Sequence, residues 1–106
     1  MENDEVFKDV LGYEGAYKVS NLGRVKSLER VVVHKNGYKY PIKERILKPV
    51  LKRGYPSVNL CLDDKRKSIK IHRLVALAFM PNPESKATVN HINGIKTDNR
   101  LENLEN

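Results

Sequence analysis

The sequence has little cysteine, few aromatic residues and no long apolar run. Its one cysteine, Cys61, has no partner in the chain for a disulfide, and a single thiol excludes a zinc site built from several cysteines. No stretch approaches the ~20 apolar residues that a membrane-spanning helix needs. The acidic start, residues 1–5, is unlike a secretory signal peptide. We therefore expect no disulfide partner, no membrane partner and a reducing, cytoplasmic location.

The composition that remains is typical of a small globular protein. Hydrophobic residues make up 40% and charged residues 31% of the chain, close to the averages for folded domains. The length of 106 residues matches one ordinary domain, because domains commonly contain roughly 100–150 residues. We expect one compact unit over residues 1–106, acting as a monomer.

Positive charge is concentrated in the middle of the chain. The sequence has 20 Lys and Arg against 13 Asp and Glu, and residues 41–73 alone hold ten basic and three acidic residues. This third therefore carries the whole net charge of +7. Such a local field attracts polyanions, of which nucleic acid is the commonest, although a solvated surface has the same composition. The residues expected to bind nucleic acid are Lys43, Arg45, Lys48, Lys52, Arg53, Lys65, Arg66, Lys67, Lys70 and Arg73.

Alternating apolar and polar residues predict β-strands in the first half of the chain. Residues 17–19 and 24–28 alternate on either side of a turn segment at residues 20–23, which is the pattern of a hairpin. Residues 31–33 continue as strand. The Asn36-Gly37 pair that follows predicts a turn.

The next segment predicts further strands. Residues 46–51 indicate an edge strand, because Pro49 cannot donate to a hydrogen-bond ladder. Residues 53–56 indicate a turn. Residues 58–62 alternate with a period of two, and residues 69–71 continue the alternation after a charged connection, which predicts a second hairpin.

One segment predicts a helix. Residues 72–80 include Leu77 and Phe79 and leave little polar surface over two turns, which is typical of a short, largely buried helix; Pro81 follows and ends it. Residues 88–92 predict a short strand before a polar loop. The fold class we expect is α+β, with mostly antiparallel strands and hairpins and one principal short helix at about residues 72–80.

The histidines are the residues best suited to chemistry at neutral pH. No nucleophile elbow, phosphate-binding glycine loop or HExxH motif is present. We interpret His34 as a surface residue and His72 as a packing or hydrogen-bonding residue between strand and helix. His91 ends a predicted strand beside a loop rich in amides, which suits a base whose unperturbed pKa is near ~6.5. Asn90 offers an oxygen for a hard divalent cation, although an Asn-His pair is also compatible with a structural role.

Two motifs in a fixed order resemble a known family. Residues 12–28, GYEGAYKVSNLGRVKSL, resemble the N-terminal modular DNA-binding motif of phage and intron-encoded nucleases. Residues 71–79, IHRLVALAF, followed by residues 81–83 and by VNHINGIKTDNRLENLE at residues 89–105, resemble the HNH motif of the same proteins. The chain thus resembles the HNH homing-type endonucleases over residues 7–105.

This resemblance implies a function and a role for individual residues. Family members hydrolyse a phosphodiester of double-stranded DNA in a ββα-metal unit that holds one divalent ion, Mg²⁺ or Mn²⁺. His91 matches the family's general base and Asn90 matches a metal ligand. Asn103 matches the asparagine that orients the loop through backbone hydrogen bonds, and His72 falls in the motif as a structural residue.

The chain departs from the family pattern at the metal site. Family members often carry Asp at the positions of Asn90 or Asn93, and both are neutral amides here. The family pattern also continues with an aromatic residue and a helix that supplies a second metal ligand, whereas Asn106 occupies the aromatic position and the sequence ends. We therefore expect the ββα unit to lack its last helix and the ion to bind weakly, because ligand charge is a main source of affinity for hard cations.

Two functions follow from the resemblance. The first is an HNH endonuclease or nickase, in which a β-rich region at residues 7–70 binds DNA and residues 71–106 form an HNH motif that is incomplete at its C-terminus. The second is a DNA-binding module derived from such a nuclease that no longer cuts. A third, an RNA-binding β-domain that stacks bases on aromatic rings, is disfavoured because the five Tyr and two Phe form no aromatic-rich strand pair.

Overall fold

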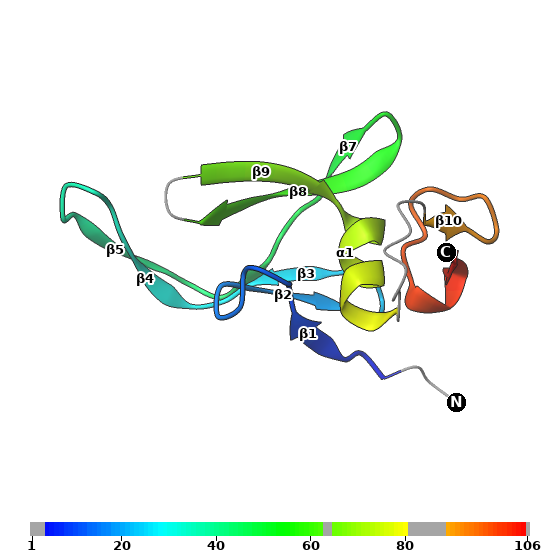
Figure 1. The fold of residues 1–106 in the computed structure, drawn as a ribbon, viewed down its shortest axis with the longest axis horizontal. Coiled ribbons are helices and arrows are strands. Elements are labelled where there is room, and N and C mark those ends of the chain that lie inside the picture. Colours follow the sequence, from blue (N-terminus) through cyan, green and yellow to red (C-terminus); the bar gives the residue numbers. More distant parts are fainter. Residues whose placement is uncertain (1–3, 63–64, 81–88, 106) are drawn as a thin grey trace.

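Short antiparallel strands surround a helix in the computed structural model, which describes residues 4–62, 65–80 and 89–105 (Figure 1). The α-helix found in these residues is α1 (Ile71–Phe79). Near the end of the described chain lies a 3-10 turn, η1 (Leu101–Asn103). The predicted fold class, α+β with mostly antiparallel strands and one principal helix, is confirmed.

The first sheet contains the predicted N-terminal hairpin. Its spatial order is β1-β2-β3-β6, and the strands are β1 (Phe7–Asp9), β2 (Tyr17–Ser20), β3 (Val25–Ser27) and β6 (Arg45–Ile46). Val19 lies opposite Val25 across the hairpin, and both are fully buried. The Ser20 hydroxyl accepts backbone N–H bonds from Leu22 and Arg24, each at 3.1 Å, which closes the turn.

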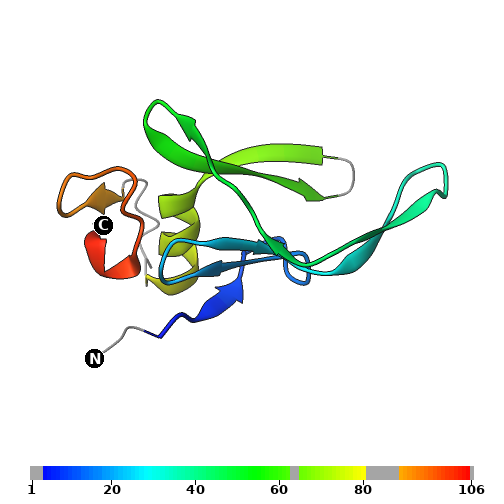
Figure 2. The same cartoon turned by 180° about the vertical axis from the view of Figure 1, so that it is seen from behind.

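A hairpin that follows the first one in the chain projects from the body of the molecule as an arm (Figure 2). It pairs β4 (Arg30–Val33) with β5 (Lys39–Ile42). The backbone N–H of His34 donates to the Tyr38 carbonyl at 2.8 Å, so the turn predicted at Asn36-Gly37 is confirmed. The His34 ring stacks on Tyr40 with the ring centres 5.0 Å apart, so the predicted surface histidine is half-buried in an aromatic cluster.

A third sheet lies above the first in Figure 1 and also contacts α1. It contains β7 (Val50–Lys52), β8 (Tyr55–Leu62) and β9 (Lys65–Lys70) in that spatial order. Arg53 and Gly54 have φ of 55° and 84°, and this pair alone makes the tight turn between β7 and β8. The turn predicted over residues 53–56 is therefore too long, because Tyr55 and Pro56 already belong to β8.

The single strand predicted over residues 46–51 is wrong. The segment forms the end of β6 and the start of β7, which lie in different sheets. The backbone N–H of Leu47 still donates to the Val25 carbonyl at 2.8 Å in the first sheet. Pro49 has no N–H to continue that ladder, so the chain leaves the first sheet and enters the third.

The core lies between α1 and the two sheets that flank it. Helix α1 begins one residue before the predicted start, and it buries Ile71, Leu74 and Val75 at the i, i+3, i+4 spacing of one helix face. Leu77, predicted to be buried, is 62% exposed because it lies off this face. The buried cluster comprises Val10, Ala16, Tyr17, Val19, Val25, Val58, Leu60, Ile71, Leu74, Val75 and Leu104.

The C-terminal segment is anchored to the same core. Strand β10 (Asn90–His91) pairs with β11 (Leu104–Glu105), and Leu104 reaches the core cluster. The strand predicted over residues 88–92 is thus shorter, because neither Val89 nor Ile92 belongs to β10, while Thr88 lies outside the described residues, as does the predicted helix stop at Pro81. The longest apolar helix that the described residues form is too short to span a membrane.

Candidate active site and basic surface

His91 lies at the end of β10 with its ring held from one side. Its Nε2 is 2.7 Å from the Oδ1 of Asn99, a residue that is 5% exposed. An amide oxygen accepts hydrogen bonds and does not donate them, so the bond places the ring proton on Nε2. The lone pair of Nδ1 is then left to take a proton, as a general base requires.

Two further rings pack around His91. The centre of the His72 ring lies 5.0 Å from that of His91 in an edge-on arrangement, and the Tyr55 ring lies 5.2 Å from His72 and 6.1 Å from His91. His72 is buried, and its Nδ1 has no hydrogen-bond partner among the described residues. Burial lowers the pKa of His72 to about 4, and electrostatic interactions with His91, Arg73 and Lys70 act in the same direction. His72 is therefore neutral at neutral pH, and its ring packs edge-on against the ring of His91.

A network of amides fixes the loop that follows His91. The Oδ1 of Asn103 accepts a hydrogen bond from the Asn93 backbone N–H at 3.1 Å. The Nδ2 of Asn103 donates to the Asn93 side chain and to the Asp98 carbonyl, both at 2.9 Å. The Arg100 guanidinium donates two hydrogen bonds to Asp98, and these bonds hold the pKa of that carboxyl well below its usual range. The loop conformation is therefore set by Asn103 and Asp98.

The N-terminal hairpin touches this site through Gly23. A Cβ atom at Gly23 would lie 3.0 Å from the Cβ and the carbonyl oxygen of Asn99, and its φ of +87° already favours glycine. The Leu101 backbone N–H donates to the Asn21 carbonyl of the same hairpin turn at 2.7 Å. The partner of His91 is thus positioned by a residue 76 positions earlier in the sequence.

Asn90 supplies an exposed amide next to His91. In the part of the chain that the structure describes, no three His, Cys, Asp or Glu side chains gather as a metal site. One neutral oxygen fits a hard divalent cation as a single ligand, and water or phosphate would have to fill the other positions. The donor set of the described residues is therefore partial.

All ten basic residues predicted to bind nucleic acid are exposed, but they do not form one cluster. Lys43, Arg45, Lys65 and Arg66 line an open cleft between the β4–β5 arm and the β8–β9 hairpin, where Tyr40 also contributes to the wall. Other members of the set lie towards the opposite end of β8 and β9, including Lys70, whose Nζ is 5.6 Å from the centre of the Tyr55 ring. The basic surface thus extends from the cleft towards His91.

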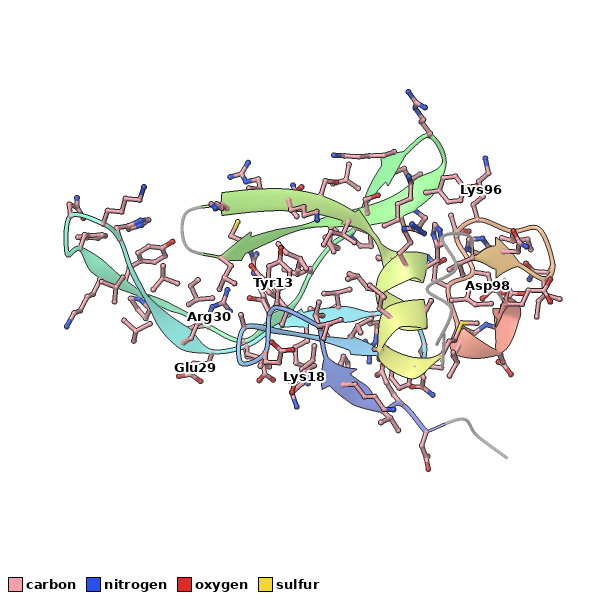
Figure 3. The ribbon with its side chains drawn as sticks, viewed as in Figure 1. Tyr13, Lys18, Glu29, Arg30, Lys96 and Asp98 are labelled. Carbon is pink, nitrogen blue, oxygen red and sulfur yellow. The ribbon has the colours of Figure 1, made fainter. Side chains whose placement is uncertain are left out.

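The sequence does not single out three residues of the site: Tyr55, Asp98 and Asn99. Asp98 and Asn99 sit in the polar loop between two motif positions, and Figure 3 places Asp98 beside β10. A polar loop gives no indication of which amide turns inward, so Asn99 had no distinguishing signal. Tyr55 belongs to a strand 36 residues before His91, and only the fold brings the two rings together.

Two family models match almost the whole chain. The NUMOD4 motif matches residues 5–61, and an HNH endonuclease model matches residues 70–106. The first match covers the first sheet, the β4–β5 arm, β7 and nearly all of β8, and the second covers the segment from α1 to β11; most of β9 lies between the two. The chain belongs to the NUMOD4-containing family of HNH endonucleases.

Its similarity to individual proteins agrees with this assignment. An uncharacterised HNH endonuclease of Acanthamoeba polyphaga mimivirus is 42% identical over 98% of this chain and 24% of its own length. The DNA endonuclease I-HmuI of Bacillus phage SP01 is 36% identical over 92% of this chain and 49% of its own length. A solved structure describing DNA binding and cleavage by I-HmuI aligns with a TM-score of 0.74 and 37% identity over 93% of this chain and 50% of that one. The chain therefore spans half or less of the length of these relatives.

Proposed function

We propose that this chain binds double-stranded DNA and hydrolyses a phosphodiester bond in it, as a monomer in the cytoplasm. Residues 7–70 provide the basic DNA-binding region and residues 71–106 the nuclease motif. The observation that carries the proposal is the setting of His91: a ring held by Asn99, backed by the neutral His72, at the end of a basic surface. The family membership and the likeness to a DNA-cleaving relative support it.

In the proposed reaction, His91 acts as the general base. Its Nδ1 takes a proton from a water molecule, whose oxygen attacks phosphorus while the bond to the leaving oxygen breaks. Asn99 fixes the tautomer, and Asn103 holds the loop that carries the site. We infer a weakly held divalent ion, Mg²⁺ or Mn²⁺, with Asn90 as a ligand; when bound, such an ion stabilises the charge that builds on the phosphate.

A second function is favoured by the partial donor set. With neutral amides at both Asn90 and Asn93, the chain would bind DNA without cutting it. The two functions share the DNA-binding surface and differ only in turnover, so one experiment separates them.

The test is nicking of supercoiled plasmid by the 106-residue chain in millimolar Mg²⁺ or Mn²⁺. We expect slow nicking that falls by about 10²–10⁴-fold in His91→Ala, the usual effect of losing a general base, while plasmid binding stays at the wild-type level. Binding without nicking in either metal would favour the second function. Nicking that survives His91→Ala would remove His91 from its role, and efficient cleavage in micromolar Mg²⁺ would contradict the weak ion site.

A further inference from the structure

Lys96 places a positive charge beside the His91 site. The family resemblance assigns no role to this residue. Its Nζ lies 4.8 Å from the centre of the Tyr55 ring, within the range of a cation–π contact. Figure 3 shows Lys96 on the loop next to β10. The same Tyr55 ring lies 6.1 Å from the ring of His91. One aromatic side chain therefore positions both the candidate base and an ammonium group.

The path of the Lys96 side chain is also fixed by the β7–β8 turn. A Cβ built at Gly54 would lie 3.4 Å from the Lys96 Cδ and 3.7 Å from its Nζ, so the lysine stem lies along this turn. The turn is the pair Arg53-Gly54, whose positive φ angles define a tight two-residue connection. The ammonium is thus held between a backbone turn and a ring.

The charge of Lys96 is not neutralised by the described part of the protein. No carboxylate among the described residues lies within ion-pair distance of Lys96 or of Lys70, which also faces the Tyr55 ring with its Nζ 5.6 Å from the ring centre. Asp98, which lies in the same loop as Lys96, is engaged by Arg100 and Asn93. Two ammonium groups on one ring, with no described carboxylate paired to either, favour an anion between or beside them.

We propose that Tyr55 and Lys96 form a phosphate-holding pair beside His91, in which Lys96 contacts the phosphodiester that is cleaved and Tyr55 positions its ammonium. This inference rests on the proposed nuclease function and adds to it a residue from each of the two matched motifs. A fixed cation stabilises charge on the phosphate most strongly in the transition state, which is useful where the metal ligands are neutral.

The test compares Lys96→Gln with Lys8→Gln, measuring single-turnover cleavage over a range of protein concentrations. Lys8 is a matched control, because its Nζ also lies 4.8 Å from an aromatic ring, that of Phe79, at the opposite end of α1. We expect Lys96→Gln to lower the maximal cleavage rate by about 10- to 100-fold with little change in half-saturation. Lys8→Gln should match the wild type, and Lys96→Arg should recover part of the loss.

Tyr55 variants separate positioning from folding. Tyr55→Phe keeps the ring and should retain the wild-type rate, whereas Tyr55→Leu should lose at least as much of the rate as Lys96→Gln, because it also removes the ring beside His91. Adding Lys96→Gln to Tyr55→Leu should then cause little further loss, since the two residues act as one unit. Full additivity, or a Lys96→Gln rate equal to that of Lys8→Gln, would overturn the inference while leaving the nuclease function in place.

A binding measurement tests the pair even if the wild type does not cleave. In the absence of metal, the ammonium signal of Lys96 in NMR spectra should shift when a short DNA duplex is added, and this shift should be lost in Tyr55→Leu. An unmoved Lys96 signal in a DNA-bound wild-type chain would overturn the phosphate contact. Absence of cleavage together with a shifted signal would overturn only the proposed catalytic function.

Discussion

Gly23 connects the N-terminal hairpin to the residue that holds His91. Alanine at this position needs a φ near +87°, which costs about 1–3 kcal/mol for a residue with a side chain, and its Cβ would also press on Asn99 at 3.0 Å. We expect Gly23→Ala to lower the free energy of unfolding and, by moving Asn99, to slow any cleavage. Thermal unfolding and plasmid nicking measure the two effects.

Gly37 is the matched control for this substitution. It has a φ of +86°, and a Cβ placed there meets nothing within 4 Å. Gly37→Ala should therefore show the backbone strain alone, with cleavage unchanged. If Gly23→Ala and Gly37→Ala gave equal losses of stability and equal rates, the contact with Asn99 would have no consequence.

His72 should make the stability of the fold depend on pH. Burial lowers its pKa in the folded protein to about 4, whereas in the unfolded chain the pKa is near ~6.5. Between these values the unfolded state binds more protons, so the contribution of the neutral ring is complete above pH ~6.5 and is lost as the pH falls towards 4. We expect urea unfolding of His72→Gln to show a shallower fall in stability over this window than the wild type. Parallel curves would contradict the buried neutral ring.

At the residue scale, the motifs pointed to the candidate site residues, whereas the contacts that hold their side chains are seen only in the fold. His91, Asn90 and Asn103 were identified by resemblance, and the structure brings His91 and Asn103 to the same loop. Asn99 and Tyr55 carried no signal in the sequence, because inward orientation of an amide or ring depends on contacts with distant strands. Their roles follow only from three-dimensional distances.

Helix α1 shows that an apolar segment need not be buried on every side. Leu74 is 3% exposed and Leu77 is 62% exposed, although they stand three residues apart. We expect Leu74→Ala to cost about 2–5 kcal/mol of unfolding free energy, as for other buried leucines, and Leu77→Ala about 0.5 kcal/mol or less. Urea unfolding of the two variants measures the difference, and equal costs would mean that Leu77 is covered in solution.

At the element scale, local patterns predicted the hairpins and missed a change of sheet. The β2–β3 hairpin and the Asn36-Gly37 turn follow from neighbouring residues, so their alternation and turn chemistry sufficed. The continuous apolar content around Pro49 predicts one strand. The two halves of this segment pair with β3 and β8 on either side of Pro49, and a continuous apolar content does not indicate this change of partner.

At the scale of the whole molecule, the exposed basic residues extend along the surface and do not form one compact cluster. Four of the ten basic residues line the cleft between the arm and the β8–β9 hairpin, while Lys70 lies near Tyr55. The charge count predicted the amount of this surface and the segment that carries it. The division of these basic residues between the cleft and the region near Tyr55 could not be predicted. It depends on how the β4–β5 arm projects from the sheets, and this follows from how the sheets are connected (Figure 1).

The cleft should bind the DNA backbone, and salt dependence measures how many of its charges take part. Each phosphate contact contributes about 0.9 to the slope of log affinity against log salt concentration, through release of counterions from the duplex. Replacing Lys65 and Arg66 by Ala removes two exposed charges from one wall of the cleft. We expect this variant to bind all duplex sequences more weakly to the same degree, with a slope reduced by about two.

The control removes the same charge from another surface. Lys8 and Lys18 lie on β1 and β2 of the first sheet and are not among the cleft residues. Replacing both by Ala changes the net charge of the protein by the same amount, so a purely long-range electrostatic effect would lower affinity equally in the two variants. A slope that falls only in the Lys65, Arg66 variant assigns the contacts to the cleft, whereas equal slopes would mean that DNA responds to net charge and not to this surface.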